Sequence, residues 1–417
     1  MFKNLFLLIA ASSCVSLQAA TLIVGPSQGV CANAAYSSIT AALAAAKPGD
    51  EIDICPALYS EQLTITQPVT LKGIGANGNN RVLIQPAAMT NVQNPSPNAP
   101  YTPSQAVISV FNTSDVVIED LAIDASMNTV SGCAVTLAAI HFSNASGRVA
   151  NNAISGAQLS NPLSCTTLFP GNGFGVQVDT TGQTGPFTVS ISGNTIHDFN
   201  RNGVLLNGAG ITAVVSRNVI SGVGPSTGYS QFGVFVALGA VARVTGNIVS
   251  QGNCGAIDVN DCIKVRSEGV VFRAAGDGSV ADSNTITDVQ SGIFLNGANK
   301  AQITNNVIMN VDALDGIDVQ GTASGYFTNS VISGNTISHV FPISSIDSVN
   351  ESGCGINEYS GTGVAQNVIL NNTVNDAYCG VAFVTADQLL TGTYVNTLIA
   401  SLNADQYPNA FPPVVEP

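Results

Sequence analysis

The stretch Ser192-Gly193-Asn194-Thr195-Ile196 recurs, with small changes, along most of the chain. Its central Asn returns as Asn218, Asn247, Asn284, Asn306, Asn335 and Asn372, at intervals of 24, 29, 37, 22, 29 and 37 residues. A short unit that returns in this way, with insertions in some copies, is typical of a solenoid in which each copy forms one coil. The repeat therefore predicts a parallel β-solenoid.

Each copy also contains a Gly followed by alternating apolar residues, which predicts a short strand with one inward and one outward face. The Gly residues are Gly203, Gly233, Gly255, Gly292, Gly316, Gly355 and Gly380. The side chains expected to face inward include Val176, Val178, Ile257, Val259, Ile317 and Val319.

The composition limits the partners. Only 9% of the residues are charged, 45% are hydrophobic and 41 are Gly, with a net charge of -14. Nucleic acids and anionic membranes need a basic surface, so neither is expected to bind, and a polyanion is disfavoured. A repeat architecture can absorb the whole length in one elongated unit, which we expect to be a monomer.

The N-terminus has the charged, apolar and small-residue regions of a secretory signal: Lys3, Leu5 to Ala11, and Ala19-Ala20. We expect cleavage near Ala19 or Ala20 and a secreted or periplasmic protein. Lipidation of Cys14 is an alternative, although Ala-Ser-Ser precedes it rather than a Leu-led box. No later stretch is long enough for a membrane span.

The cysteines that follow the signal are even in number, which in an exported protein predicts disulfides. Cys31 and Cys55 flank a helix-like segment at 37–47. Cys354 and Cys379 each precede the Gly of consecutive coils, where adjacent strands lie about 4.8 Å apart, within reach of a bridge. Proximity leaves Cys133 with Cys165 and Cys254 with Cys262.

The segments 37–52, 55–65 and 68–75 resemble the N-terminal cap and first coil of right-handed parallel β-helix proteins of the pectin-lyase-like superfamily. The resemblance extends roughly over residues 21–385. It implies a ladder of stacked Asn side chains at a tight turn, and it implies the fold rather than an activity.

We therefore expect an all-β, right-handed parallel β-helix of about ten coils with an N-terminal helical cap. The expected divisions are a signal peptide at 1–20, the cap at 21–62, the β-helix at 63–386, and a C-terminal cap and tail at 387–417.

Alignment of the strands that follow the Gly residues predicts an outward row of Gln177, Leu205, Phe235, Asp258, Phe294, Asp318, Asn357 and Ala382. The positions two residues further on add Asp179, Asn207, Asn260, Asn296, Gln320 and Tyr359. Such a shallow polar face with aromatic rings suits the stacking and hydrogen bonding of sugars. The predicted contacts to a polysaccharide or surface glycan are Phe235, Asn260, Phe294, Asn296, Asn357 and Tyr359.

The charges concentrate between Cys254 and Asp282. They are Asp258, Asp261, Lys264, Arg266, Glu268, Arg273, Asp277 and Asp282. With Asp258 and Asp318 two coils and about 9 to 10 Å apart, a hydrolase with paired carboxylates is one hypothesis. A lyase in which Lys264 or Arg266 neutralises a uronate is another. The predicted catalytic residues are Asp258, Asp261, Lys264, Arg266 and Asp318.

The segment Asn260-Asp261-Cys262-Ile263 is similar to the Asp-Asp-Cys-Ile segment of polygalacturonase-type hydrolases, which would make Asp261 the general acid. The first Asp of that segment is Asn260 here. The Asn-x-Asp, Gly-His-Gly and Arg-x-Lys elements of those enzymes have no match in the expected order.

Structural interpretations stand beside these hypotheses. Acids next to Gly turns often cap backbone N–H groups, and charges often form ion pairs that keep an insertion ordered. Phe235 and Phe294 could stack on each other's coils. The protein would then be a non-catalytic cell-surface or envelope protein that binds a glycan or partner.

No cofactor is predicted. We expect the three histidines to form no cluster, with His141 and His339 isolated near strand ends and His197 after an Asn-Thr-Ile turn, so zinc is not implied. Asp312, Asp315 and Asp318 leave calcium as an alternative, although calcium needs six or more oxygens and this string supplies three carboxylates.

Overall fold

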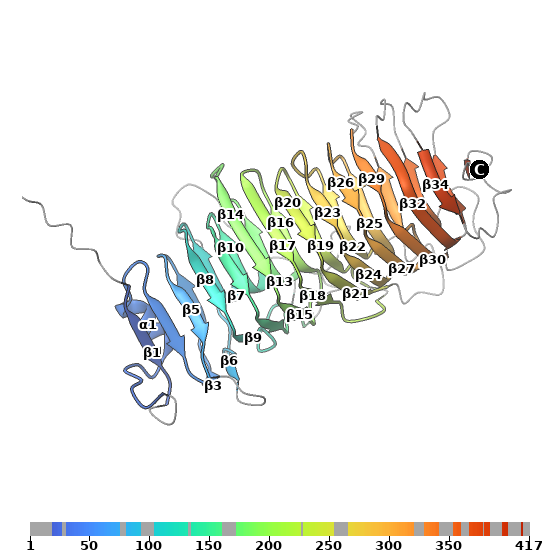
Figure 1. The fold of residues 1–417 in the computed structure, drawn as a ribbon. Helices are drawn as coiled ribbons and strands as arrows, with labels where there is room; N and C mark the ends of the chain where they lie inside the picture. Colours follow the sequence, from blue (N-terminus) through green and yellow to red (C-terminus); the bar gives the residue numbers. More distant parts are fainter. Residues whose placement is uncertain are drawn as a thin grey trace, which may run out of the picture.

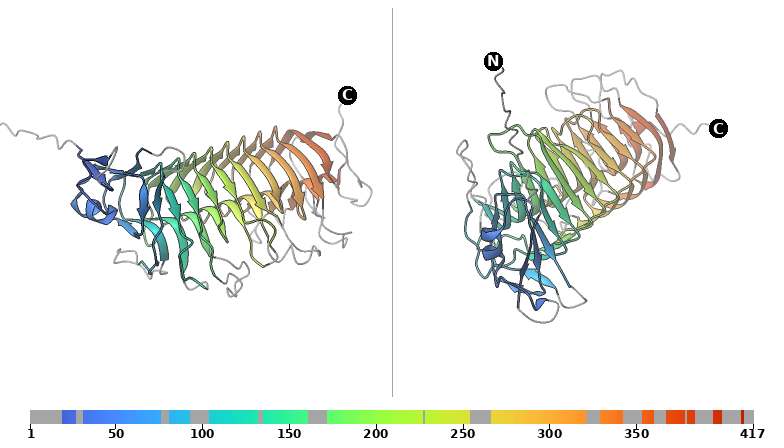
Figure 2. Two further views of the ribbon diagram at one scale, coloured as in Figure 1. Left: turned by 90° about the horizontal axis from the view of Figure 1, so that it is seen from below. Right: turned by 60° about the vertical axis from the view of Figure 1, so that its left-hand side comes forward.

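The computed structural model describes residues 19–26, 31–75, 81–92, 104–131, 135–160, 172–226, 228–253, 266–320, 329–341, 353–359, 367–377, 379–383, 394–398 and 410–411. Its strands stack one behind another along a single axis, so that the chain advances steadily from one end of an elongated rod to the other (Figures 1 and 2). The predicted all-β parallel β-helix is confirmed.

The strands form two long sheets. Within the described ranges, sheet A has 23 strands and sheet B has 12. The pairings are parallel except that between β33 (Cys379–Phe383) and β35 (Ala410–Phe411). The other strands of sheet B are β4 (Leu63–Ile65), β7 (Ser104–Phe111), β10 (Thr136–Ser143), β13 (Gly173–Asp179), β16 (Asn202–Asn207), β19 (Phe232–Ala237), β22 (Glu268–Arg273), β25 (Ser291–Asn296), β28 (Ile317–Gln320) and β31 (Cys354–Tyr359).

Most coils contribute two consecutive short strands to sheet A. These strands are β1 (Thr21–Val24), β2 (Glu51–Ile54), β3 (Ala57–Tyr59), β5 (Thr70–Gly73), β6 (Val82–Ile84), β8 (Val116–Glu119), β9 (Ala122–Asp124), β11 (Gly147–Ala150), β12 (Ala153–Ser155), β14 (Phe187–Ser192), β15 (Thr195–His197), β17 (Ile211–Ser216), β18 (Val219–Ser221), β20 (Val241–Thr245), β21 (Ile248–Gly252), β23 (Val280–Asp282), β24 (Thr285–Val289), β26 (Gln302–Thr304), β27 (Val307–Asp312), β29 (Val331–Ser333), β30 (Thr336–Phe341), β32 (Val368–Ala377) and β34 (Tyr394–Leu398).

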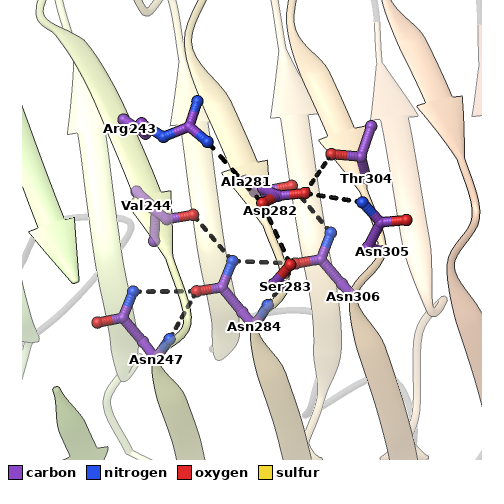
Figure 3. Close-up of polar contacts among 10 residues, drawn as sticks. All are labelled: Arg243, Val244, Asn247, Ala281, Asp282, Ser283, Asn284, Thr304, Asn305 and Asn306. Carbon is purple, nitrogen blue, oxygen red and sulfur yellow. Dashed lines mark hydrogen bonds and ion pairs between the residues drawn. The ribbon is translucent and has the colours of Figure 1, made fainter. Parts of the chain in front are cut away.

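The recurring Asn residues form the ladder that the resemblance implies (Figure 3). The side-chain amide of Asn247 donates to Oδ1 of Asn284 at 2.9 Å and to the carbonyl of Val215 at 2.9 Å. The backbone N–H of Asn247 donates to the same Oδ1 at 3.0 Å. This pattern continues in both directions from Asn152 to Asn372, and it satisfies backbone groups that the turn between two strands would otherwise leave buried without partners.

The recurring Gly residues of sheet B stack where each coil bends. A Cβ placed on Gly203 would lie 2.3 Å from Cγ2 of Ile220 and 2.8 Å from the carbonyl oxygen of Gly233. The same two kinds of neighbour, a core β-branched side chain and the next coil's carbonyl, crowd Gly233, Gly269, Gly292 and Gly316. Only Gly fits because any side chain would push the adjacent coils apart.

The helix α1 (Ile39–Ala45) lies at the N-terminal end of the rod (Figure 1). Ser38 caps it, and the carboxylate of Glu61 accepts the N–H groups of Ile39 and Thr40, both at 2.8 Å. The predicted disulfide between Cys31 and Cys55 is present, with a Cα separation of 6.3 Å. Among the described residues, no helix is long and apolar enough to cross a membrane.

The alignment predicted for Asp258 is wrong. The strand between β19 and β25 is β22, and Gly269 occupies the Gly position in it. A Cβ placed on Gly269 would lie 2.5 Å from Cγ2 of Ile286. Val271 pairs with Phe235 and Phe294 at the outward position predicted for Asp258. Val270 and Phe272 take the buried positions predicted for Ile257 and Val259, and Arg273 takes that of Asn260.

The other cysteine predictions fall on different parts of the chain. Cys354 and Cys379 are Cα partners in adjacent parallel strands, the placement that the predicted bridge requires. The residues Cys133, Cys165, Cys254 and Cys262 lie outside the described residues.

Candidate functional site

The outer face of sheet B is where the predicted row lies. Strict alternation would place the side chain directly before each Gly and the one two residues after it on opposite faces, so contact between them indicates that the strand bends at its Gly. The rings of Phe232 and Phe235, which flank Gly233 in this way, are 5.1 Å apart at an interplanar angle of 71°. Asn357 likewise donates to Asp315 of the preceding coil at 3.0 Å. The face is therefore a folded surface on which neighbouring side chains converge.

The composition of this row differs from the predicted alternation of Phe and Asp. In spatial order it reads Ser109, His141, Gln177, Leu205, Phe235, Val271, Phe294, Asp318 and Asn357. Apolar side chains occupy its middle and polar ones its two ends. Most of these side chains are buried, including Asp318 at 2% exposure, so the prediction of a shallow, exposed polar face is wrong.

A pocket of about 140 Å³ opens between the apolar middle of the row and its charged end. The predicted residues Phe235, Arg266, Phe294 and Asn296 line it. The remaining lining residues are Phe232, Glu268, Val271, Arg273 and Gln320.

Arg266 joins two buried carboxylates at this pocket. Its Nε lies 3.0 Å from Oε1 of Glu268, and its Nη2 donates to Oδ2 of Asp318 at 2.8 Å. Gln320 donates to the same Oδ2 at 3.0 Å. Glu268 comes from β22 and Asp318 from β28, so a single guanidinium connects strands separated by β25.

Burial controls the protonation of these acids. It raises the pKa of Glu268 to about 7, although the adjacent Arg266 acts in the opposite direction. Burial also raises the pKa of Asp318, with Arg266 again opposing the rise. The pKa of Asp315 is raised well above its usual range, first by burial and then by the charge of Asp318. Glu268 can therefore hold or release a proton near neutral pH.

The predicted stacking role of Phe294 needs correction. The Arg266 guanidinium lies over its ring, 4.4 Å from the centroid, and leaves Phe294 only 7% exposed. Arg201 lies over Phe232 in the same way at 4.9 Å. Phe235 is half-buried, so it is more exposed than Phe232 and Phe294, the other aromatic side chains that line the pocket.

Two of the aspartates that left calcium as an alternative have protein partners. Asp315 accepts the backbone N–H of Cys354 at 2.9 Å as well as the amide of Asn357. Asp318 pairs with Arg266. In the part of the chain that the structure describes, no group of three or more His, Cys, Asp or Glu side chains is placed to hold a metal.

Of the remaining predicted site residues, one lies in a described strand and four lie outside the described residues. The backbone of Tyr359 pairs with that of Gln320, beside the pocket's polar end. Asp258, Asn260, Asp261 and Lys264 lie outside the described residues, in the segment that leads to Arg266. The prediction missed Glu268 and Arg273 as site residues, although both flank the stretch Gly269 to Phe272 that carries the strand pattern.

His141 was predicted to be isolated, which is wrong. It lies within β10 at the N-terminal end of the row, with Nε2 2.7 Å from Oδ2 of Asp179 and Nδ1 3.3 Å from Oγ of Ser104. Asp179 also accepts from the amide of Gln177 at 2.8 Å. These residues form a second polar cluster, at the opposite end of the row from Asp318.

Known proteins support the fold. A comparison with curated proteins found no match. Solved structures similar to this chain include a GH136 lacto-N-biosidase from Eubacterium ramulus, 12% identical with a TM-score of 0.50 over 91% of this chain and 68% of that chain. The A-module of mannuronan C-5 epimerase AlgE6 from Azotobacter vinelandii is 14% identical, with a TM-score of 0.44 over 87% of this chain and 95% of that chain. Thermotoga maritima exopolygalacturonase is 10% identical, with a TM-score of 0.33 and coverage of 84% and 83%.

The similarity to the lacto-N-biosidase, at 12% identity, shows the fold alone. At the level of sequence families, residues 25–286 match DUF1565, described as a protein of unknown function. That match spans more than half of the chain. The protein is therefore a member of the DUF1565 family.

Proposed function

We propose that this protein is exported, binds a polysaccharide or surface glycan along the outer face of sheet B, and hydrolyses a glycosidic bond at the Glu268 pocket. The observation that carries the proposal is the pair of buried carboxylates, Glu268 and Asp318, that share the one guanidinium of Arg266. Glu268 and Arg266 line the pocket, and Asp318 lies on the other side of that guanidinium contact. Glycoside hydrolysis commonly uses two such acids with different protonation.

The two acids have different roles in this proposal. Glu268, with a pKa of about 7, is partly protonated at neutral pH and can give its proton to the leaving oxygen. Asp318 is held by Arg266 and Gln320 and supplies the negative charge that stabilises the developing cation or activates water. Phe235 and Asn296 offer the sugar an aromatic edge and an amide. Asp258, Asp261 and Lys264 remain proposed members of the same site.

The alternative is a non-catalytic surface or envelope protein that binds a glycan or partner. One observation favours it: Arg266 already pairs with both carboxylates and stacks on Phe294. Ion-pair clusters of this kind also stabilise folds without doing chemistry, and they perturb pKa values in the same way.

A panel of neutral and acidic polysaccharides distinguishes these functions. A hydrolase produces new reducing ends, whereas a lyase produces unsaturated ends that absorb in the ultraviolet. Glu268→Gln and Asp318→Asn should each lower kcat by roughly 10²- to 10⁴-fold. Glu119→Gln is the control, because Glu119 lies on β8 of sheet A, where it pairs with Arg148.

Binding without turnover by the wild-type protein would establish the non-catalytic alternative. Absence of both binding and turnover across the panel would reject the proposal as a whole.

Export has its own test, since the mature protein should begin near Ala19 or Ala20 when its N-terminus is sequenced after expression with the native leader.

A further inference from the structure

The His141 cluster at the other end of the outer face has a different chemistry from the pocket. Its members come from β7, β10 and β13, three neighbouring strands near the N-terminal end of sheet B. His141 and Glu268 lie on strands four steps apart, which corresponds to about 19 Å. The two clusters are therefore separate sites on one face.

The hydrogen bonds of this cluster define a direction for proton transfer. Burial acts to raise the pKa of Asp179, but His141, Ser143 and Gln177 outweigh it, and the net pKa is lowered. Asp179 is therefore ionised and accepts from the Nε2–H of His141. When the imidazole is neutral, that bond leaves Nδ1 as an acceptor, 3.3 Å from Oγ of Ser104, whose proton has the carbonyl of Val92 at 3.3 Å as its other acceptor. Serine, imidazole and carboxylate thus stand in the order that activates a nucleophile.

The burial of the cluster supports this role. Ser104 and His141 are 2% and 6% exposed, so the imidazole and the carboxylate interact with little screening by water. Oδ1 of Asp179 and Oε1 of Gln177 are buried acceptors that receive no hydrogen bond. A buried polar atom without a partner is costly to folding, and a catalytic role is one physical explanation for it.

We propose that Ser104, His141 and Asp179 form a second catalytic site, which hydrolyses carboxylic esters of short acyl groups. Oγ of Ser104 forms a bond to the carbonyl carbon while its proton passes to Nδ1 of His141. The ester C–O bond then breaks, and the alcohol leaves with that proton. Water attacks the acyl-enzyme, gives its proton through His141 to Oγ, and releases the carboxylic acid. Asp179 and Gln177 are positioning residues that fix the tautomer of His141.

An acyl ester fits the surroundings of Ser104. Ala106, Ala138 and Phe174 form an apolar cluster on the same three strands, with the partly buried Leu205 packed against it. Apolar walls favour a hydrocarbon chain over a charged group, which would lose its hydration there. Because the alanines occupy positions that carry Phe232 and Glu268 in later coils, a short acyl chain is the expected substrate.

The test uses the full mature chain with a fluorophosphonate probe, which reacts with activated serines, and with 4-nitrophenyl acetate as substrate. We expect one covalent adduct, located at Ser104 by mass spectrometry. Ser104→Ala should abolish the adduct, and Ser104→Ala and His141→Gln should lower kcat by roughly 10²-fold or more. Asp179→Asn should lower kcat and leave KM unchanged, which a merely structural role would not produce.

Ser109→Ala is the matched control. Ser109 is also buried on β7 and is the Cα partner of His141, so the variant disturbs the same strand and should keep both the adduct and the hydrolysis. An adduct at Ser109, or no adduct together with hydrolysis at the buffer rate, would overturn the proposal. The wild-type labelling alone decides between these outcomes, whether or not a variant folds.

Discussion

Arg266 determines the electrostatics of the pocket because it is the cation in direct contact with two buried acids. Burying an unpaired carboxylate is expensive, so such a group either neutralises itself or finds a partner. Asp318 has two donors, Arg266 and Gln320. Glu268 has the Arg266 contact, but burial outweighs it and raises its pKa to about 7, so Glu268 is partly protonated near neutral pH.

The raised pKa of Glu268 predicts a pH-dependent stability. In the unfolded chain its pKa is near the usual 4.5, whereas in the folded protein it is about 7, so the folded state binds the proton more tightly. This contribution to stability is present below the unfolded value and is lost as the pH rises through 7. The difference corresponds to about 3 kcal/mol at most.

Glu268→Gln keeps the shape of the side chain and removes the titration. The free energy of unfolding, measured by denaturant titration at about pH 5 and about pH 8, should fall less for this variant than for the wild type. The change in the free energy of unfolding between the two pH values is compared for the variant and the wild type. The difference between these two changes reports on Glu268, because Asp315 and Asp318 are present in both proteins. Equal changes would mean that Glu268 is ionised in the folded state throughout.

A second prediction concerns the Asn ladder. Asn247→Ala would remove the acceptor for the backbone and side-chain N–H groups of Asn218, and the donor to Val215. Each buried polar group left without a partner costs about 1 to 3 kcal/mol, so we expect a loss of about 3 kcal/mol or more in denaturant unfolding followed by circular dichroism. Thr212→Ser, at an exposed position of β17, should change the stability by less than about 0.5 kcal/mol. Similar values for both variants would contradict a stabilising ladder.

At the scale of the strand, the stacked Gly residues allow adjacent coils of sheet B to approach each other closely. A Cβ on Gly269 would lie 2.5 Å from Ile286 Cγ2 and 2.7 Å from the carbonyl oxygen of Gly292. The carbonyl belongs to the backbone of the next coil and cannot move aside alone. Gly269→Ala should therefore destabilise the protein by about 1 to 3 kcal/mol and disturb the pocket that β22 lines.

Gly252 in β21 offers a matched control for this prediction. The nearest atoms to a Cβ at this position are 3.7 Å away, and its φ is not in the left-handed region. Gly252→Ala should change the melting temperature little, or raise it slightly by restricting the unfolded chain. If both substitutions cost the same, the close approach of the coils does not depend on the Gly contacts.

The register of the strands of sheet B could be predicted from the sequence only where the Gly pattern was unambiguous. The Asn repeat and the Gly of β19, β25 and β28 fixed the coil register correctly, because both residues meet steric or hydrogen-bonding demands that few others satisfy. The charged coil contains two Gly-apolar patterns, at Gly255 and Gly269. In the first pattern, Asp258 stands three residues after Gly255. In the second, Val271 stands two residues after Gly269, the same spacing that separates Phe235 and Phe294 from the Gly of their own strands. Strict counting would have favoured Gly269.

The polar contacts could not have been predicted in the same way. Ser104 and Arg266 each stand three residues before the bend position of their strands and fold back over it to reach residues of other coils. Such contacts depend on the curvature of the chain rather than on alternation along it. Alternation predicts which face a side chain occupies, but a bend decides which side chains on that face meet.

For the whole molecule, the rod presents both clusters and the apolar middle along one face of sheet B, so an extended chain ligand could contact all three at once. The protein has 12 Lys and Arg residues against 26 Asp and Glu residues, and its net charge of -14 surrounds that face with a negative field. The ligand's charge must therefore influence its affinity even where it touches no charged side chain.

This field gives the last prediction, which rests on the proposed binding of a polysaccharide. At about 0.01 M salt the Debye length is about 30 Å, and at about 0.15 M it is about 8 Å, so added salt screens repulsion from distant carboxylates. An acidic polysaccharide should bind several-fold more tightly at the higher salt, whereas a neutral one should be insensitive. Calorimetric titration of matched neutral and acidic polymers measures both. If salt instead weakens the binding of the acidic polysaccharide, local contacts with Arg266 and Arg273 outweigh the field of the whole chain. Arg273→Gln should then remove that salt dependence.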